Sequence, residues 1–309
     1  MSTPDPRAIA RLRSRLPSRV EPAGPVLVTL DDTPASHLPV RWAAAEAAVR
    51  GTTLRVVRSV VTPPPVVVPA TPWGTWYPWT SADGRSPARA AWDAARADLE
   101  DVVRQAHEVD PRLGVDAGLA QAGAASARRD DALLVVGRRR GFRALGGPVP
   151  GTACRAARRA RLPVAVVGLA DSPQAGPSAH RVVAAPRAGE DPTGVLDVAF
   201  RAAARRATGV TVVHVPGATL PAAVAAEVLA EVLDPYAQVF PEVDVRTRAV
   251  SALARAVVQE SEGAALTVVG VPSSPRDVTG RSLVRRIVSG TRGTVVLVPS
   301  ETSAHERRG

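Results

Sequence analysis

The sequence predicts an α/β fold made of two tandem open parallel five-stranded sheets with helices on both faces. Two observations predict it. Short apolar strands alternate with alanine-rich helices along the chain, which favours parallel sheets joined by right-handed crossovers. One plan of elements also occurs twice: the segment from Arg50 to Val57 recurs from Arg206 to Val213, and Leu134–Gly137 recurs as Thr267–Gly270. A repeat of this length makes each half a domain.

The repeat and the composition of the intervening segments predict the domain boundaries. We expect a basic disordered arm at 1–23, a first domain at 24–169, a linker at 170–179, a second domain at 180–299 and a polar tail at 300–309. The linker is rich in Pro, Ser and Gly, and the arm carries arginines on a polar background. With 309 residues and 45% hydrophobic content, the chain is long enough for two cores of ordinary domain size.

The first domain begins with a continuous apolar strand, as expected for a strand covered on both faces. A helix rich in alanine follows it, with Trp42 on its apolar stripe. The expected strands are 25–30, 53–60, 114–117, 132–136 and 162–167, and the expected helices are 39–50, 89–108 and 124–129.

A proline-rich and tryptophan-rich insertion from Thr62 to Trp79 interrupts the first domain. It is predicted to be a loop because its prolines fix the backbone and remove hydrogen-bond donors. Trp73, Trp76 and Trp79 carry too much aromatic surface to stay wholly in water. We expect them to pack on the protein, and a contact with a protein partner or a bound ring is the alternative.

The second domain repeats the plan. Asp191-Pro-Thr predicts a helix start, with Asp as the N-cap and Pro at the first helical position. The expected strands are 182–186, 210–215, 243–247, 266–269 and 294–298, and the expected helices are 191–206, 220–233 and 253–260, with a further basic helix before the last strand.

The composition of the sequence excludes several classes of protein. A single cysteine, Cys154, excludes an internal disulfide framework and any multi-cysteine metal site. No apolar run is long enough for a membrane span, and the N-terminus lacks the apolar core of a signal peptide, so we expect a cytoplasmic protein. The histidines are scattered without metal-ligand spacing, and no nucleophile motif is present, so neither a metal site nor a catalytic residue is predicted.

Two segments of the first domain lie where open parallel sheets bind ligands, at the carboxyl ends of strands on either side of the topological switch. Asp31 ends the first strand. The fourth strand ends in Val136-Gly137-Arg-Arg-Arg140-Gly141, and Gly151-Thr152 opens the next helix. Glycines let backbone amides approach a phosphate, a helix N-terminus attracts anions, and Arg138, Arg139, Arg140 and Arg143 would supply countercharge. A solvated turn in an arginine-biased protein is the alternative interpretation.

These segments resemble the universal stress protein family in its tandem two-domain form. The family opens with an apolar strand followed by Asp-Gly-Ser, and here Asp31-Asp32-Thr33 is similar. Its closing motif reads Val-Val-Gly-x-x-Gly, nine residues, then Gly-Ser. Here Val135-Val-Gly137 matches, Arg140 stands where the second glycine is expected, and Gly141 leads through nine residues to Gly151-Thr152.

The resemblance implies a Rossmann-like fold of the adenine nucleotide alpha hydrolase kind and a pocket for ATP with Mg²⁺. It places Asp31 near the adenosine and assigns the phosphates to Gly137, Gly141, Gly151 and Thr152, and the additional Arg140 would either clamp the phosphates or block them. In the second domain Arg187 stands where Asp31 stood, and the loop after Gly270 is shortened and stiffened by prolines. That half is predicted to be a degenerate domain that caps the first through edge strands, so that one chain imitates a dimer.

The leading hypothesis is a stress-associated regulatory protein that binds ATP in its first domain and at most hydrolyses it slowly. The alternative is a nucleotide-free interaction module that uses the tryptophan loop to bind a protein partner. Further homodimerisation stays open. Nucleic-acid binding through the arm or through Arg138–Arg143 is not expected, because aromatic residues are scarcely interleaved with these arginines.

Overall fold

The computed structural model describes residues 19, 24–30, 37–60, 86–121, 132–138, 157, 161–168, 178–187, 190–216, 222–272, 274 and 276–299. Contacts between residues divide the chain into two compact units, which we describe separately. The N-terminal unit is Gly24–Val136, and the C-terminal unit comprises Met1–Ala23 and Gly137–Gly309. The tryptophan loop, the expected helix at 124–129 and the polar tail lie outside the described residues.

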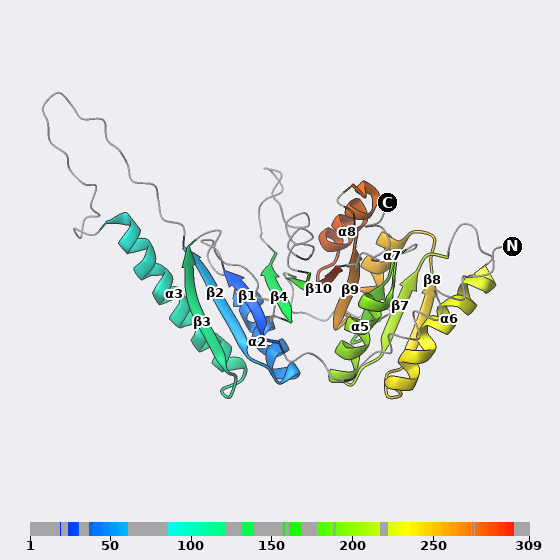
Figure 1. The fold of residues 1–309 in the computed structure, drawn as a ribbon, viewed down its shortest axis with the longest axis horizontal. Coiled ribbons are helices and arrows are strands. Elements are labelled where there is room, and N and C mark those ends of the chain that lie inside the picture. Colours follow the sequence, from blue (N-terminus) through cyan, green and yellow to red (C-terminus); the bar gives the residue numbers. More distant parts are fainter. Residues whose placement is uncertain are drawn as a thin grey trace, which may run out of the picture. The chain divides into compact units, whose positions relative to one another are not determined.

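The N-terminal unit is a parallel sheet in the order β3-β2-β1-β4 (Figure 1). Its helices α2 and α3 contact each other and pack on the sheet, α2 mainly against β1 and α3 against β2 and β3. The side chain of Ser86 accepts the backbone N–H of Arg89 and caps the start of α3. The elements are β1 (Val26–Leu30), α2 (His37–Arg50), β2 (Leu54–Val60), α3 (Pro87–Val109), β3 (Val115–Gln121) and β4 (Leu133–Gly137).

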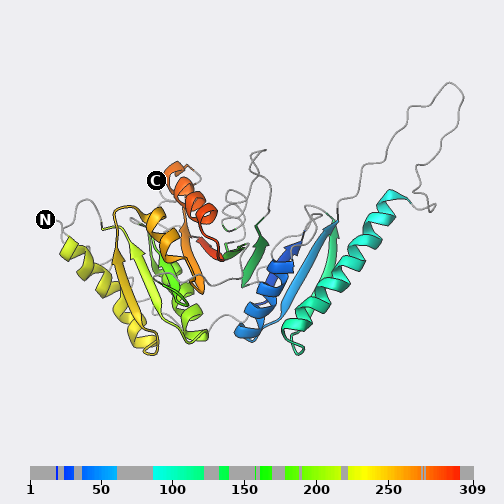
Figure 2. The same cartoon turned by 180° about the vertical axis from the view of Figure 1, so that it is seen from behind.

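The C-terminal unit contains the strand order β5-β10-β9-β6-β7-β8. Helices α5 and α6 cover one face of this sheet and α7 and α8 cover the other (Figures 1 and 2). The elements are β5 (Val164–Val167), β6 (Val182–Ala185), α5 (Thr193–Arg205), β7 (Val210–His214), α6 (Ala222–Val239), β8 (Val245–Ala249), α7 (Leu253–Glu260), β9 (Leu266–Val271), α8 (Val278–Gly290) and β10 (Val295–Pro299).

The second half of the chain follows the strand order of the first. The series β4-β1-β2-β3 corresponds to β9-β6-β7-β8, and all pairs within each series are parallel. The predicted α/β fold with mostly parallel strands is therefore confirmed. One pair is antiparallel: β5, the last strand of the first repeat, pairs with β10, the last strand of the second, with Val166 opposite Val295.

Several helix boundaries differ from the sequence prediction, most of them by one or two residues, and two differences have a clear structural reason. Helix α5 has Pro192 rather than Asp191 as its N-cap, although the Asp191 carboxylate still accepts the Thr193 N–H at 2.9 Å. Helix α6 was expected to end at Leu233, and it continues through Pro235 to Val239. The lost backbone donor is offset by packing, because Tyr236 and Phe240 bury their rings against Phe200 at centroid distances of 4.8 and 6.0 Å.

Candidate functional site

The carboxyl ends of β1 and β4 lie at the same edge of the N-terminal sheet. The two strands pair in parallel, with Val26 opposite Leu133 and Val28 opposite Val135. The chain leaves β1 for β2 on one side and returns to β4 on the other, which makes this edge the topological switch point. β1 ends at Leu30, directly before Asp31, and β4 ends at Gly137. The predicted site therefore begins at two neighbouring strand ends.

Gly137 is the predicted site residue that the structure describes, as the last residue of β4. The other five lie outside the described residues, so their roles stay predictions: Asp31, Arg140, Gly141, Gly151 and Thr152. The same holds for Trp73, Trp76 and Trp79.

Arg138 follows Gly137, and both its backbone and its side chain donate hydrogen bonds. Its backbone N–H donates to the carbonyl of Val167 at 3.2 Å, and its Nη1 donates to the carbonyl of Thr291, which follows α8 in the second repeat. Its Nε and Nη2 atoms are buried without a hydrogen-bond partner in the described part of the chain. Burial lowers the pKa of the Arg138 guanidinium.

Two buried donors on a cationic group without an acceptor are costly, so this position favours an anionic partner. The sequence identified Arg138 only as one of four countercharges. Its contact with the second repeat could not be expected, because Thr291 lies 153 positions away in the chain. The signal in the sequence was the arginine directly after the strand-ending glycine.

The equivalent edge in the second repeat is built around Arg187. β6 and β9 pair in parallel as β1 and β4 do, and Arg187 follows β6 at the position that corresponds to Asp31. Its guanidinium forms ion pairs with Glu190, at 2.7 Å, and with Asp277. The Asp277 carboxylate is the N-cap of α8 and accepts the Gly280 N–H at 2.7 Å. That hydrogen bond, and then the one from Arg187, hold the pKa of Asp277 below its usual value.

The Arg187 side chain covers both glycines of this edge. A Cβ on Gly280 would overlap the Arg187 guanidinium and the Asp277 carboxylate, and a Cβ on Gly270 would lie 3.9 Å from Arg187 Cγ. The helix N-terminus that could attract an anion already holds the carboxylate of Asp277. The second repeat therefore fills this edge with its own charged side chains.

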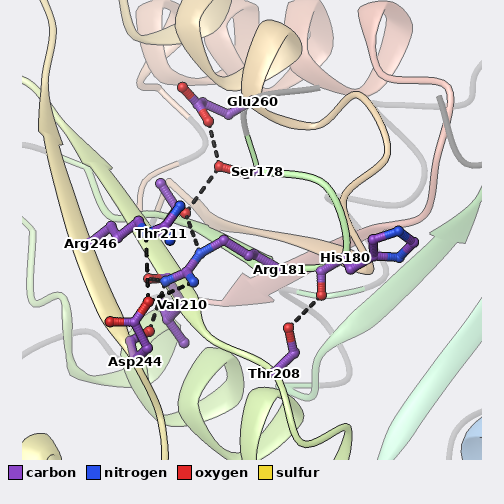
Figure 3. Close-up of polar contacts among 9 residues, drawn as sticks. All are labelled: Ser178, His180, Arg181, Thr208, Val210, Thr211, Asp244, Arg246 and Glu260. Atoms are coloured by element: carbon purple, nitrogen blue, oxygen red, sulfur yellow. Dashed lines mark hydrogen bonds and ion pairs between the residues drawn. The ribbon is translucent and has the colours of Figure 1, made fainter. Parts of the chain in front are cut away.

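A separate polar cluster lies at the opposite edge of the same sheet, near the amino ends of β6, β7 and β8 (Figure 3). Arg181 donates to Thr211 Oγ1 at 3.1 Å, to the Asp244 carboxylate at 2.8 Å, and to two backbone carbonyls. Ser178, which is 2% exposed, donates to the buried carboxylate of Glu260, and Glu260 also pairs with Arg248.

This cluster serves the fold. Each of its buried charges has an opposite charge as a partner, so it has no free group for a ligand. It also anchors the chain just before β6, because Ser178 closes the segment that was predicted as a linker. Its position at the amino ends of the strands is likewise opposite to the edge where parallel sheets bind ligands.

Among the described residues, no helix is long and apolar enough to cross a membrane. Within the same ranges, no three His, Cys, Asp or Glu side chains come together in a way that could hold a metal ion.

Sequence comparisons agree with the geometry. The profile of the universal stress protein family matches residues 23–168. Universal stress protein Rv1996 of Mycobacterium tuberculosis is 30% identical over 203 residues, which cover 61% of this chain and 62% of the relative. Universal stress protein Rv2623 of the same species is 29% identical over 265 residues, which cover 79% of this chain and 85% of the relative. The match thus spans just under two thirds of Rv1996.

Solved structures share the fold. A universal stress protein from Archaeoglobus fulgidus superimposes with a TM-score of 0.65 at 12% identity, covering 90% of this chain and 97% of that one. Protein PA1789 of Pseudomonas aeruginosa gives a TM-score of 0.53 at 12% identity, with 90% and 93% coverage. The family profile thus assigns residues 23–168 to a universal stress protein domain, and a relative from that family aligns with 79% of the chain.

Proposed function

We propose that the first repeat binds an adenine nucleotide, ATP with Mg²⁺, at the carboxyl ends of β1 and β4, as a regulatory ligand of a cytoplasmic stress-associated protein. The proposal rests on the side chain of Arg138, which follows Gly137 at the end of β4. Two nitrogens of its guanidinium group are buried and have no hydrogen-bond acceptor in the described part of the chain. A phosphate oxygen is the acceptor that fits such a group best.

The remaining residues of the proposed site come from the sequence. Asp31 would contact the adenosine. Gly137 and Gly141 would let backbone amides approach the phosphates, and Gly151 and Thr152 would add the N-terminus of a helix. Arg140 would lie beside the phosphates as a further countercharge. Because no nucleophile or general base is assigned, we propose that ATP is held rather than turned over, with slow hydrolysis at most.

The second repeat is proposed to be a pseudo-domain that binds no nucleotide. Arg187 reverses the charge of the Asp31 position, and its ion pair with Asp277 fills the strand edge and the helix N-terminus. Its contribution would be structural. The antiparallel pairing of β5 with β10 joins the last strands of the two repeats, as a dimer of single domains would.

The test is calorimetric titration of ATP with Mg²⁺ into the full chain after any copurified nucleotide has been removed. Asp31→Ala should weaken binding about tenfold to a hundredfold, the cost of one or two hydrogen bonds to a charged group. Asp32→Ala, the matched control at the next position, should leave the affinity unchanged. Equal effects of the two variants would argue against the assignment of Asp31.

Absence of binding to the unmodified chain would reject the nucleotide proposal altogether. The alternative function, an interaction module that uses Trp73, Trp76 and Trp79, would then be tested by replacing those three residues.

A further inference from the structure

The outer face of α8 carries an unusual concentration of positive charge. Five arginines on this helix and its flanks are exposed, and none of their guanidinium groups donates a hydrogen bond or forms an ion pair within the described ranges. They are Arg276, Arg281, Arg285, Arg286 and Arg292. We call this set the α8 face. At about 1.5 Å per residue, it extends along roughly 24 Å of the chain.

The charge of the α8 face is not balanced by its own helix. The one carboxylate in this stretch, Asp277, is engaged mainly by Arg187 and by the N–H of Gly280, and Arg281 makes the weakest of the interactions that lower its pKa. Helix α7 packs against α8, and the one exposed charged residue that it contains is Arg255. The neighbouring helix therefore adds positive charge.

The exposed arginines of helix α3 lie among acidic residues, although Arg89 and Arg96 form no ion pair within the described ranges. There Arg104 forms ion pairs with Asp101 and with Glu108, the latter at 2.6 Å. Acidic residues recur along the whole exposed side of α3, whereas between Val278 and Arg292 there are none. An arginine-rich composition alone does not explain this difference between two helices of one protein.

The other exposed side chains of α8 fit a phosphate backbone. Thr279, Ser282 and Ser289 are exposed among the arginines. Hydroxyl and guanidinium groups are both common donors to phosphate oxygens. The helix has no Asn or Gln, the residues that read adenine edges. It has no aromatic residue on which an unpaired base could stack.

A membrane surface fits this face less well. An interfacial helix needs a broad apolar side that can enter the lipid. The apolar residues Val284, Ile287 and Val288 are all buried in the protein, and Val278 alone is a large apolar side chain exposed on the helix, at 66%.

We infer that the α8 face binds the phosphate backbone of double-stranded DNA without reading its sequence. The guanidinium groups of α8 and its flanks can follow a strand along the wide major groove of B-form DNA, whereas the deep and narrow major groove of A-form RNA is closed to side chains. This site differs from the arm and the Arg138–Arg143 loop, for which no nucleic-acid role is expected.

The test measures the anisotropy of a labelled duplex of about 24 base pairs at increasing salt, with the full chain. The triple variant Arg281→Gln, Arg285→Gln, Arg286→Gln should weaken binding at least about tenfold and reduce the slope of log K against log salt by about three, because each arginine neutralises one phosphate. The matched control is Arg89→Gln, Arg96→Gln, Arg104→Gln on α3. It removes the same charge and should change affinity by no more than about twofold.

Any of four results with nucleic acids would overturn the inference. The unmodified chain fails to bind DNA at low salt, both triple variants weaken binding equally, two duplexes of unrelated sequence differ more than about tenfold in affinity, or an RNA duplex binds as tightly as DNA. Binding of the α8 face to anionic vesicles in place of DNA would likewise reject it. Circular dichroism of each variant shows whether the chain is still folded.

Discussion

The guanidinium of Arg187 forms an ion pair with the carboxylate of Asp277, 90 positions later in the chain, where Asp277 also caps helix α8. One residue follows the first strand of the second repeat, and the other begins the helix after its fourth strand. The pair therefore joins the two segments that in the first repeat are predicted to hold a nucleotide.

Removing this pair should destabilise the second repeat. Asp277→Ala loses the N-cap hydrogen bond to Gly280 and leaves Arg187 with Glu190 alone, and the expected cost is about 1–2 kcal/mol of unfolding free energy. Asp234→Ala is the control, because Asp234 is exposed on α6 and accepts one hydrogen bond from Gln238. Urea unfolding measures both. Equal stabilities of the two variants would contradict a structural role for the pair.

Tyr236 should contribute through its hydroxyl as well as its ring. The hydroxyl donates to Asp197 at 2.9 Å and lies 3.2 Å from the carbonyl of Thr193. Burial, and then Asp197, raise the pKa of Tyr236, so the donor stays protonated. Tyr236→Phe keeps the packing on Phe200 and should cost about 1 kcal/mol, whereas Tyr236→Ala should cost about 3–5 kcal/mol. If Tyr236→Phe were as unstable as Tyr236→Ala, the ring packing would contribute nothing beyond the hydroxyl, which would contradict this prediction.

The end of β5 should not tolerate a side chain at Gly168. A Cβ there would overlap the backbone carbonyl oxygens of Arg292 and Gly293, in the loop before β10. Gly168→Ala is therefore expected to lower the unfolding free energy by about 1–3 kcal/mol. Gly293→Ala is the matched control in the same loop, since no atom lies within 4 Å of its added Cβ. Thermal unfolding of the two variants measures the difference in stability. If Gly168→Ala were as stable as Gly293→Ala, the close contact between Gly168 and the loop before β10 would be contradicted.

Stability should fall on mild acidification because of His214. Burial lowers the pKa of this histidine below its ordinary value of 6.5. The unfolded chain then binds more protons than the folded one just below pH 6.5, so the unfolding free energy rises with pH in that window and decreases as pH falls through it. The difference between about pH 5.5 and 7.5 should shrink in His214→Gln. An unchanged difference would show that other groups cause it.

Local patterns in the sequence were sufficient to predict the α/β fold. Valine-rich runs identified the strands, and alanine-rich segments identified the helices, because both patterns depend on burial within one element. Helix α6 is longer than predicted because the rings of Phe200 and Tyr236, 36 positions apart in the chain, pack together, and a local rule about proline cannot include that contact.

The candidate site was only partly predictable. A glycine after a buried strand indicated the ligand edge at Gly137, and the charge reversal at Arg187 indicated a changed second edge. Arg187 forms an ion pair with Asp277, and Arg138 donates a hydrogen bond to the carbonyl of Thr291. Both are side-chain contacts between distant segments that no pattern in the sequence encodes.

The most direct test of the account is the number of nucleotides bound per chain, measured by equilibrium dialysis of labelled ATP with Mg²⁺ against nucleotide-free protein. We predict saturation at one nucleotide per chain, loss of binding in Arg138→Gln, and no change in Arg187→Gln. Saturation at two, or binding that is insensitive to Arg138 but lost with Arg187, would contradict the assignment of the ligand site to the first repeat and of the filled edge to the second.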